Sequence, residues 1–139
     1  MPKDGDIKSG IGASSKRRED VRFLTGNGNY TDDINIRGQA YVFFLRSDVA
    51  HGTLNSVDTS SASAMPGVVQ IFTGADFEAV GGIPCGWEVT DKHGQPMQEP
   101  KHPVLAHGKV RHVGEPIAAV VADSLEQARD AAEAIEVDI

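Results

Sequence analysis

The chain has 139 residues, a net charge of −7 and 40% hydrophobic residues, which suits one domain with a packed core. The acidic balance argues against general nucleic-acid binding, and no apolar run approaches the ~18 residues of a membrane span. The single cysteine excludes an internal disulfide, an all-cysteine zinc site and a self-contained iron–sulfur cluster. The start lacks an apolar signal segment, so we expect a soluble, cytoplasmic protein of mixed α/β structure.

The N-terminal segment is polar, rich in Gly and Ser, and without periodicity. It predicts a flexible arm over residues 1–15, with the folded domain over 16–139. Residues 1–22 hold six basic and four acidic side chains, whereas residues 123–139 hold six acidic and one basic. One interpretation is that both ends are ordinary solvated surface. The other is that the basic N-terminal segment lies against an acidic surface of this chain or of a partner. Composition leaves the two interpretations open.

The first half of the chain predicts two helices and three strands. A helix is expected from Lys16 to Leu24, followed by a Gly/Asn turn over 26–29. Residues 40–46 (AYVFFLR) are apolar on both faces, which predicts a central strand. The further expected elements are a strand over 53–57, a short helix capped by Asp58-Thr59-Ser60 and ended by Pro66-Gly67, and a strand over 68–72.

The second half begins with an irregular stretch. Residues 74–103 lack clear periodicity, and such a long loop is functional, disordered or covered by another part of a larger protein; short strands within it are allowed. Strands are then expected over 109–113 and over 116–122 (PIAAVVA), the latter buried on both faces. Ser124 and Gln127 match a capping box that starts a helix to Ile135, before a last strand over 136–139. The crossover is long enough to join parallel strands, so we predict an α+β fold with a mixed sheet and two or three helices.

Histidine and cysteine offer no convincing metal or nucleophile site. The histidines are His51, His93, His102, His107 and His112. The last three recur every five residues, which fits neither a helix face nor a strand face, so zinc binding would need loops to gather them. Solvated or hydrogen-bonded structural histidines are the favoured interpretation. Cys85 has no helix N-terminus or local cation to activate it, so we expect an inert thiol in a loop or in the core.

The remaining chemical motifs are incomplete. Gly10-Ile11-Gly12 lacks the spacing of a phosphate loop, and Gly26-Asn27-Gly28 lacks the third glycine of a dinucleotide fingerprint. The adjacent carboxylates Glu19-Asp20 and Asp32-Asp33 favour turn capping or solvated charge over acid–base chemistry. We therefore predict no catalytic, cofactor-binding or metal-binding residue in this chain.

Several short motifs follow one another in a fixed order. They are Gly26-Asn27-Gly28-Asn29-Tyr30-Thr31-Asp32-Asp33, Leu45-Arg46-Ser47, Ala50-His51, Val57-Asp58-Thr59-Ser60, Pro66-Gly67-Val68-Val69, Phe72-Thr73-Gly74-Ala75-Asp76 and Val113-Gly114-Glu115-Pro116-Ile117-Ala118-Ala119-Val120. From Arg17 to Ile139 the series resembles the N-terminal α/β-hammerhead domain of the molybdenum hydroxylases. These are the large subunits of the xanthine dehydrogenase, aldehyde oxidoreductase and carbon monoxide dehydrogenase group.

The resemblance implies a structural and subunit-interaction domain of a molybdopterin-dependent oxidoreductase, non-catalytic on its own. In that family the molybdopterin-binding loops and the general-base glutamate lie beyond this region, and Glu115 is not that base. The resemblance places 2Fe-2S clusters and FAD on other subunits or domains. It implies the remainder of the large subunit and the iron–sulfur and FAD subunits as partners. We expect the isolated domain to expose an apolar patch or to self-associate.

Two rival hypotheses remain. One is a stand-alone small-molecule or protein-binding module with the same fold, and the other is a small enzyme with an unrecognised site in the 81–112 loop.

The matched residues have expected structural roles. Gly26 and Gly28 allow a tight turn, and Arg46 binds a carboxylate or carbonyls. His51 hydrogen-bonds the backbone of its loop. Asp58 and Thr59 cap a helix, and Gly114-Glu115-Pro116 sets the entry of the central strand.

Overall fold

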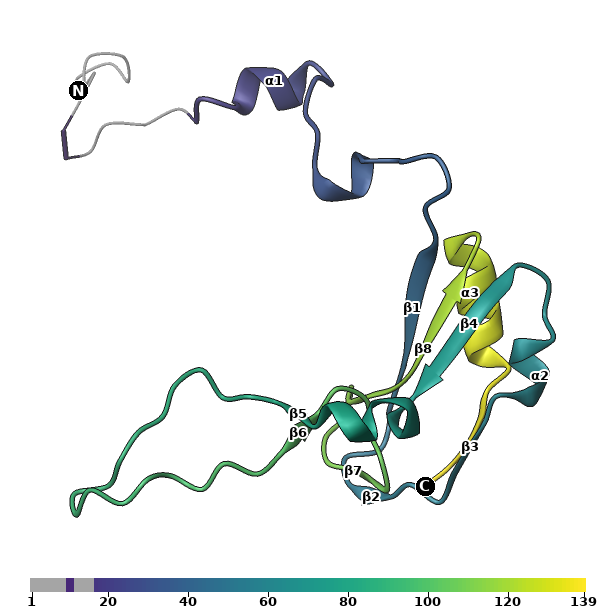
Figure 1. Ribbon diagram of the computed structural model, residues 1–139. Coiled ribbons are helices and arrows are strands. Elements are labelled where there is room, and N and C mark those ends of the chain that lie inside the picture. Colours follow the sequence, from purple (N-terminus) through teal and green to yellow (C-terminus); the bar gives the residue numbers. More distant parts are fainter. Residues whose placement is uncertain (1–9, 12–16) are drawn as a thin grey trace. The chain divides into compact units, whose positions relative to one another are not determined.

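The structure is a computed structural model that describes residues 10–11 and 17–139. Its contacts divide the chain into two units, Met1–Arg37 and Gly38–Ile139 (Figure 1). The predicted arm over 1–15 lies outside the described residues apart from Gly10 and Ile11. The boundary between arm and domain therefore stays a prediction.

The first unit contains helix α1, Asp20–Leu24, and the short 3-10 helix η1, Thr31–Asp33. The helix was predicted from Lys16, which lies outside the described residues; among the described residues the helix begins at Asp20. Basic residues precede Asp20, and positive charge is unfavourable at a helix N-terminus. The predicted turn is confirmed: Gly26 has φ 74°, and a Cβ on Gly28 would collide with the ring of Phe23. That ring stacks on Tyr30 with centroids 5.1 Å apart.

The second unit is built on a three-stranded sheet. Strand β8, Pro116–Ala122, lies between β1, Tyr41–Arg46, and β4, Val68–Thr73, and both pairs are antiparallel. The predicted burial of β8 is confirmed, because only its first and sixth residues are half-exposed. The prediction that β1 is central is wrong: within the described residues it is an edge strand with alternating exposure.

The α+β class is confirmed, but every strand pair in the described part of the chain is antiparallel, so the sheet is not mixed. The last strand, β9, Glu136–Asp138, was expected to run parallel to β8. It pairs instead with β3, Ser56–Asp58. The reason is that β1 and β4 already occupy both edges of β8.

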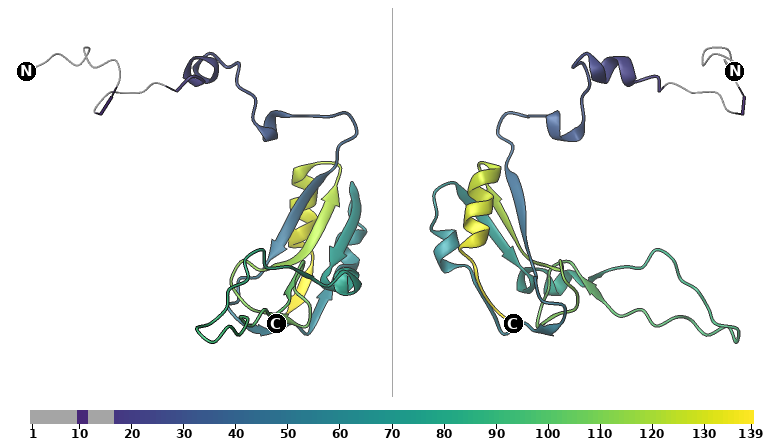
Figure 2. Two further views of the ribbon diagram at one scale, coloured as in Figure 1. Left: turned by 60° about the vertical axis from the view of Figure 1, so that its left-hand side comes forward. Right: turned by 180° about the vertical axis from the view of Figure 1, so that it is seen from behind.

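Helix α3, Leu125–Glu133, covers one face of the sheet (Figures 1 and 2). Ser124 caps it by accepting a hydrogen bond from the backbone N–H of Gln127 at 3.2 Å, as predicted. The Gln127 carboxamide does not complete the predicted capping box; it lies beside Gly67. Small side chains let the helix approach the sheet closely. The fully buried ones are Ala128, Ala131 and Ala132, which pack with Ala118, Val120 and Ala122 of β8.

The strand predicted over 53–57 is two shorter strands. Strand β2, Gly52–Thr53, pairs with β7, Lys109–Val110, whereas β3 pairs with β9. The predicted strand over 109–113 thus ends at Val110. Helix α2, Ser60–Ser63, follows β3, and Asp58 accepts a hydrogen bond from the Ser60 N–H at 2.9 Å. Asp58 therefore helps to order the helix start, but Thr59 stands at the N-cap position and makes no side-chain cap hydrogen bond, so the predicted cap by Thr59 is wrong.

The irregular stretch over 74–103 begins with a 3-10 helix, η2, Gly74–Val80, which was not predicted from the sequence. Two short strands follow, β5, Gly82–Ile83, and β6, His102–Pro103, which pair with each other. All residues from 83 to 102 are exposed. In the described part of the chain, no helix combines the length and apolar character needed to cross a bilayer.

Candidate functional site

The sheet face opposite α3 is the most conspicuous surface of the second unit. Directly paired residues of antiparallel strands project to the same side of a sheet. The register therefore places six side chains on this side, which we call the outer face: Val42, Phe44, Gln70, Phe72, Ala119 and Val121. Gln70 is its one polar member.

The outer face is largely uncovered within residues 38–139. Val42 is 48% exposed and Phe44 is 43% exposed. The ring of Phe72 contacts the ring of Phe77 in η2, with centroids 5.9 Å apart. A solvated face of an antiparallel sheet usually carries polar side chains. An apolar face of this kind is typical of a surface that packs against other protein.

Three hydrogen bonds hold the end of β1 beside the outer face. We call the bond from Arg46 to Gly114 the lock. The Arg46 guanidinium donates to the carbonyl oxygen of Gly114 at 2.9 Å, which confirms the predicted role of this arginine. The Gly114 N–H donates to the Ser47 carbonyl at 2.7 Å, and the Ser47 N–H donates to the Glu115 carbonyl at 2.9 Å. The Arg46 guanidinium also lies 5.7 Å from the Phe44 ring centroid, so a positive charge borders the apolar surface.

Glu115 is buried, with 2% of its surface exposed. Its carboxylate accepts hydrogen bonds from the Arg111 backbone N–H and, at 3.4 Å, from the Arg111 guanidinium. The His112 ring nitrogen Nδ1 lies 3.9 Å from the same carboxylate. These contacts hold the turn over 111–115, and they support the expectation that this segment sets the entry of β8.

Of the five histidines, the structure brings His102 and His112 close together. The rings of His102 and His112 stack with centroids 6.4 Å apart, while His107 lines a separate pocket. The predicted hydrogen bond of His51 is not found within the described residues, where its ring is exposed. Across residues 10–11 and 17–139, no three His, Cys, Asp or Glu side chains are placed to hold a metal ion. Cys85 is exposed in its loop.

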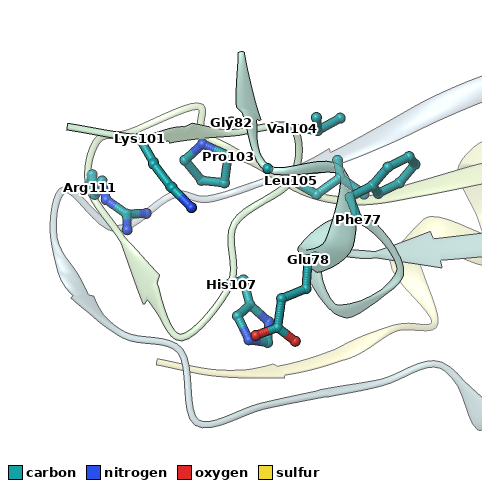
Figure 3. Close-up of a pocket in the computed structure, with 11 residues that line it drawn as sticks. Phe77, Glu78, Gly82, Lys101, Pro103, Val104, Leu105, His107 and Arg111 are labelled. Carbon is teal, nitrogen blue, oxygen red and sulfur yellow. The ribbon is translucent and has the colours of Figure 1, made fainter. Parts of the chain in front are cut away.

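A small pocket of about 200 Å³ lies between η2 and residues 101–111 (Figure 3). Lys101 and Arg111 lie on one side of it, and Glu78 and His107 lie together on another. Phe77 supplies part of its apolar lining. Charges of both signs around an apolar floor can hold a small polar group, but the volume is below the usual range of small-molecule sites.

Three exposed carboxylates stabilise local structure. The backbone N–H and hydroxyl of Thr73 lower the pKa of Asp76 by donating to its carboxylate at 2.6 and 3.1 Å. Hydrogen bonds from Ser60 lower the pKa of Asp58. The pKa of Glu126 is lowered by its own backbone N–H and by Ser124. These groups order helix starts and lie away from the outer face.

The outer face was not predicted as a site from the sequence. The relevant signal is the run Val42-Phe43-Phe44-Leu45, in which successive residues project to opposite faces and all are apolar. Apolar side chains on both faces of a strand indicate that both faces pack against other protein. They do not indicate whether the protein that packs on the second face belongs to this unit.

Known proteins resemble this chain over most of its length. Residues 25–139 match the family described as "Aldehyde oxidase and xanthine dehydrogenase, a/b hammerhead domain". The large subunit of nicotine 6-hydroxylase from Paenarthrobacter nicotinovorans is 41% identical over 130 residues, which are 93% of this chain and 15% of that protein. The carbon monoxide dehydrogenase large chain of Afipia carboxidovorans is 38% identical over the same shares. The solved quinoline 2-oxidoreductase of Pseudomonas putida 86 has a TM-score of 0.74 and 41% identity, over 90% of this chain and 15% of that one.

The chain thus spans about 15% of the length of these relatives. The ordered motifs from residue 26 to residue 120 lie entirely within the matched range, which confirms the resemblance drawn from them. The chain therefore belongs to the a/b hammerhead domain family of the aldehyde oxidase and xanthine dehydrogenase large subunits.

Proposed function

We propose that this chain is the structural and subunit-interaction domain at the N-terminal end of a molybdopterin-dependent oxidoreductase large subunit. The outer face is the observation that carries the proposal, because an apolar sheet surface gains stability only when protein covers it. The remainder of the large subunit is the partner, and its length in the relatives supports this choice.

The chemistry belongs to the rest of the assembly. We assign molybdenum–molybdopterin to the remainder of the large subunit, and 2Fe-2S clusters and FAD to other subunits or domains, in the cytoplasm. We assign no residue of this chain to the cofactor or to catalysis, because the resemblance places the molybdopterin-binding loops and the general-base glutamate beyond this region. The assembled enzyme would hydroxylate a carbon centre or oxidise an aldehyde or carbon monoxide, with water as the oxygen source.

The arrangement of the unit suits a docking role. Helix α3 and the buried small residues of β8 stiffen the sheet from one side, so the other side is presented as a fixed surface. The lock from Arg46 to Gly114 ties the edge strand to the entry of β8. A fixed surface loses little conformational entropy when a partner binds to it.

The test is binding between this chain and the remainder of the large subunit from the same gene. Val42→Thr combined with Phe44→Gln should weaken binding at least about tenfold, because it places uncompensated polar groups in the contact. Val113→Thr is the matched control, since Val113 is 62% exposed and lies off the outer face. Equal binding by both variants would contradict the proposal, as would a stop codon directly after Ile139.

A second candidate is a stand-alone small-molecule or protein-binding module. The pocket beside η2 favours it, because Lys101 and Arg111 lie on one side of an apolar lining. Small aromatic carboxylates are suitable probes, since they match a cation beside an apolar floor. A rise in melting temperature that Lys101→Met abolishes would support this candidate, and no response to any of them would count against it.

A further inference from the structure

The stretch between β5 and β6, residues 84–101, is a hairpin. From here on we call this hairpin the arm; it is distinct from the N-terminal arm predicted over residues 1–15. Its two halves pair in antiparallel fashion: the Met97 N–H donates to the Val89 carbonyl at 2.9 Å, and the Asp91 N–H donates to the Gln95 carbonyl at 2.8 Å. A bridge between Thr90 and Pro96 lies in the same register. The arm is thus a defined extension of β5 and β6, as the ribbon also shows (Figure 2).

Local hydrogen bonds order both ends of the arm. At the tip, the Asp91 carboxylate accepts from the backbone N–H groups of His93 and Gln95 at 2.8 and 2.9 Å, and Gly94 has φ 77°. At the base, the Glu99 carboxylate accepts from the Cys85 N–H at 2.6 Å. The arm is therefore organised before it meets any partner.

The register gives the arm two unlike faces. Trp87 and Val89 are two residues apart and share a face, and Met97 lies directly opposite Val89. We call this trio the arm face; its members are 76%, 48% and 36% exposed. The other face carries Glu88, Thr90 and Gln98, together with Pro96. The same register places Glu99 opposite Trp87, and Asp91 opposite Gln95, so polar side chains of the base and the tip flank the arm face. The three apolar side chains between them have no cover within the described residues.

We propose that the arm face is a second docking surface, separate from the outer face, and that it packs into an apolar groove on the remainder of the large subunit. This inference rests on the proposed function. A two-stranded hairpin alone is marginally stable in water, so packing against another surface is what would stabilise the arm. Trp and Met are enriched in the buried centres of protein interfaces.

The charges of the arm specify the chemistry of the groove. Residues 86–98 carry Glu88, Asp91 and Lys92, so their net charge is only −1. The matching groove is apolar and close to neutral, and recognition rests on buried area rather than on ion pairs. Binding through the arm should therefore change little between low and high salt.

The remainder of the large subunit is chosen as the occupant because this chain spans about 15% of its relatives. Within one polypeptide the remainder is also at high effective concentration. A second copy of the chain is the alternative that the experiment must separate.

The test uses the fact that Trp87 is the one tryptophan of the chain. The whole chain is labelled with 5-fluorotryptophan, and its single fluorine resonance is followed as the unlabelled remainder of the large subunit is added. Docking should shift the resonance and abolish its difference between light and heavy water. Val89→Thr with Met97→Gln should weaken binding about tenfold, whereas Thr90→Ala with Gln98→Ala, on the other face, should leave binding unchanged.

Each outcome separates the two proposals. Binding of the remainder with an unchanged fluorine signal would overturn the arm proposal and leave the proposed function standing. No binding at all would overturn both. A resonance that shifts with the concentration of the chain alone would identify a second copy as the occupant and overturn the chosen partner. The fluorine measurement needs no substitution, so it decides the case even if a variant fails to fold.

Discussion

The guanidinium of Arg46 donates a hydrogen bond to the carbonyl oxygen of Gly114 across 68 residues of sequence, at 2.9 Å. The bond joins the last residue of the edge strand to the turn that precedes the central strand. Two backbone hydrogen bonds of Ser47, to Gly114 and Glu115, reinforce this connection.

Replacing Arg46 with methionine should keep the aliphatic packing and remove this hydrogen bond. We expect the free energy of unfolding to fall by about 1 kcal/mol, the usual worth of one such bond. Urea denaturation followed by circular dichroism measures the change. Arg22→Met is the control, because the pair between Arg22 and Glu19 is exposed on both sides and contributes little. An equal loss in both variants would show that the bond to Gly114 has no special weight.

Glu115 should tolerate no apolar substitution. Glu115→Ala leaves the Arg111 N–H without its acceptor in a buried site, which should cost about 1–3 kcal/mol. Glu115→Gln keeps an acceptor oxygen and should cost less. Paired urea denaturation curves give both values. A glutamine variant as unstable as the alanine variant would mean that the negative charge, rather than the acceptor, is what the turn requires.

Asp76 should make stability depend on acidity. Hydrogen bonds from Thr73 lower the pKa of Asp76 in the folded state, so the unfolded state binds a proton at higher pH than the folded state does. The stabilisation is complete above the ordinary aspartate pKa and is lost as pH falls from there through the lowered value. Melting temperatures of wild type and Asp76→Asn should therefore differ at neutral pH and converge in acid. A constant difference would contradict the linkage.

Gly74 should resist the smallest possible enlargement. A Cβ at this position would collide with the carbonyl oxygen of Ala106, which is backbone and cannot rotate away. Gly74→Ala should cost about 1–3 kcal/mol, as overpacking does elsewhere. Gly86→Ala is the matched control, since a Cβ there meets nothing within 4 Å. Thermal unfolding of the two variants decides, and a neutral Gly74→Ala would show that η2 can shift as a whole.

The isolated chain should associate with itself when nothing covers the outer face. Light scattering should show a mass that rises with concentration, and Val42→Thr with Phe44→Gln should reduce that rise. The Val113→Thr variant should behave as wild type. A strict monomer at all concentrations would weaken the argument that the outer face needs cover.

The elements that sequence predicted well are those specified locally. The apolar run of β8 and the Ser124 cap of α3 are both short-range signals, and both are confirmed. The predicted strand over 53–57 failed because its partner changes at Leu54 and Asn55, whose N–H groups donate to Gly108 and Asp138. Such a change depends on distant residues and leaves no mark in the segment itself.

The candidate site was harder to predict for a similar reason. The sequence of β1 is apolar on both faces, which was interpreted as a central strand, whereas β1 lies at the edge of the sheet. Binding of a carbonyl by Arg46 was predicted from the sequence, but the identity of that carbonyl, which belongs to Gly114, was not. In the arm, apolar and polar residues alternate over Trp87-Glu88-Val89-Thr90, a run too short to predict a strand without the register that the turn at Asp91 sets.

The position of Trp87 has a practical effect on how this chain can be studied. Trp87 is 76% exposed on the arm, far in sequence from the alanine-rich contacts between α3 and β8. Intrinsic fluorescence would therefore report solvent-like emission from an intact molecule, and would hardly change as the core melts. A folded preparation judged by that optical signal alone would be mistaken for a denatured one.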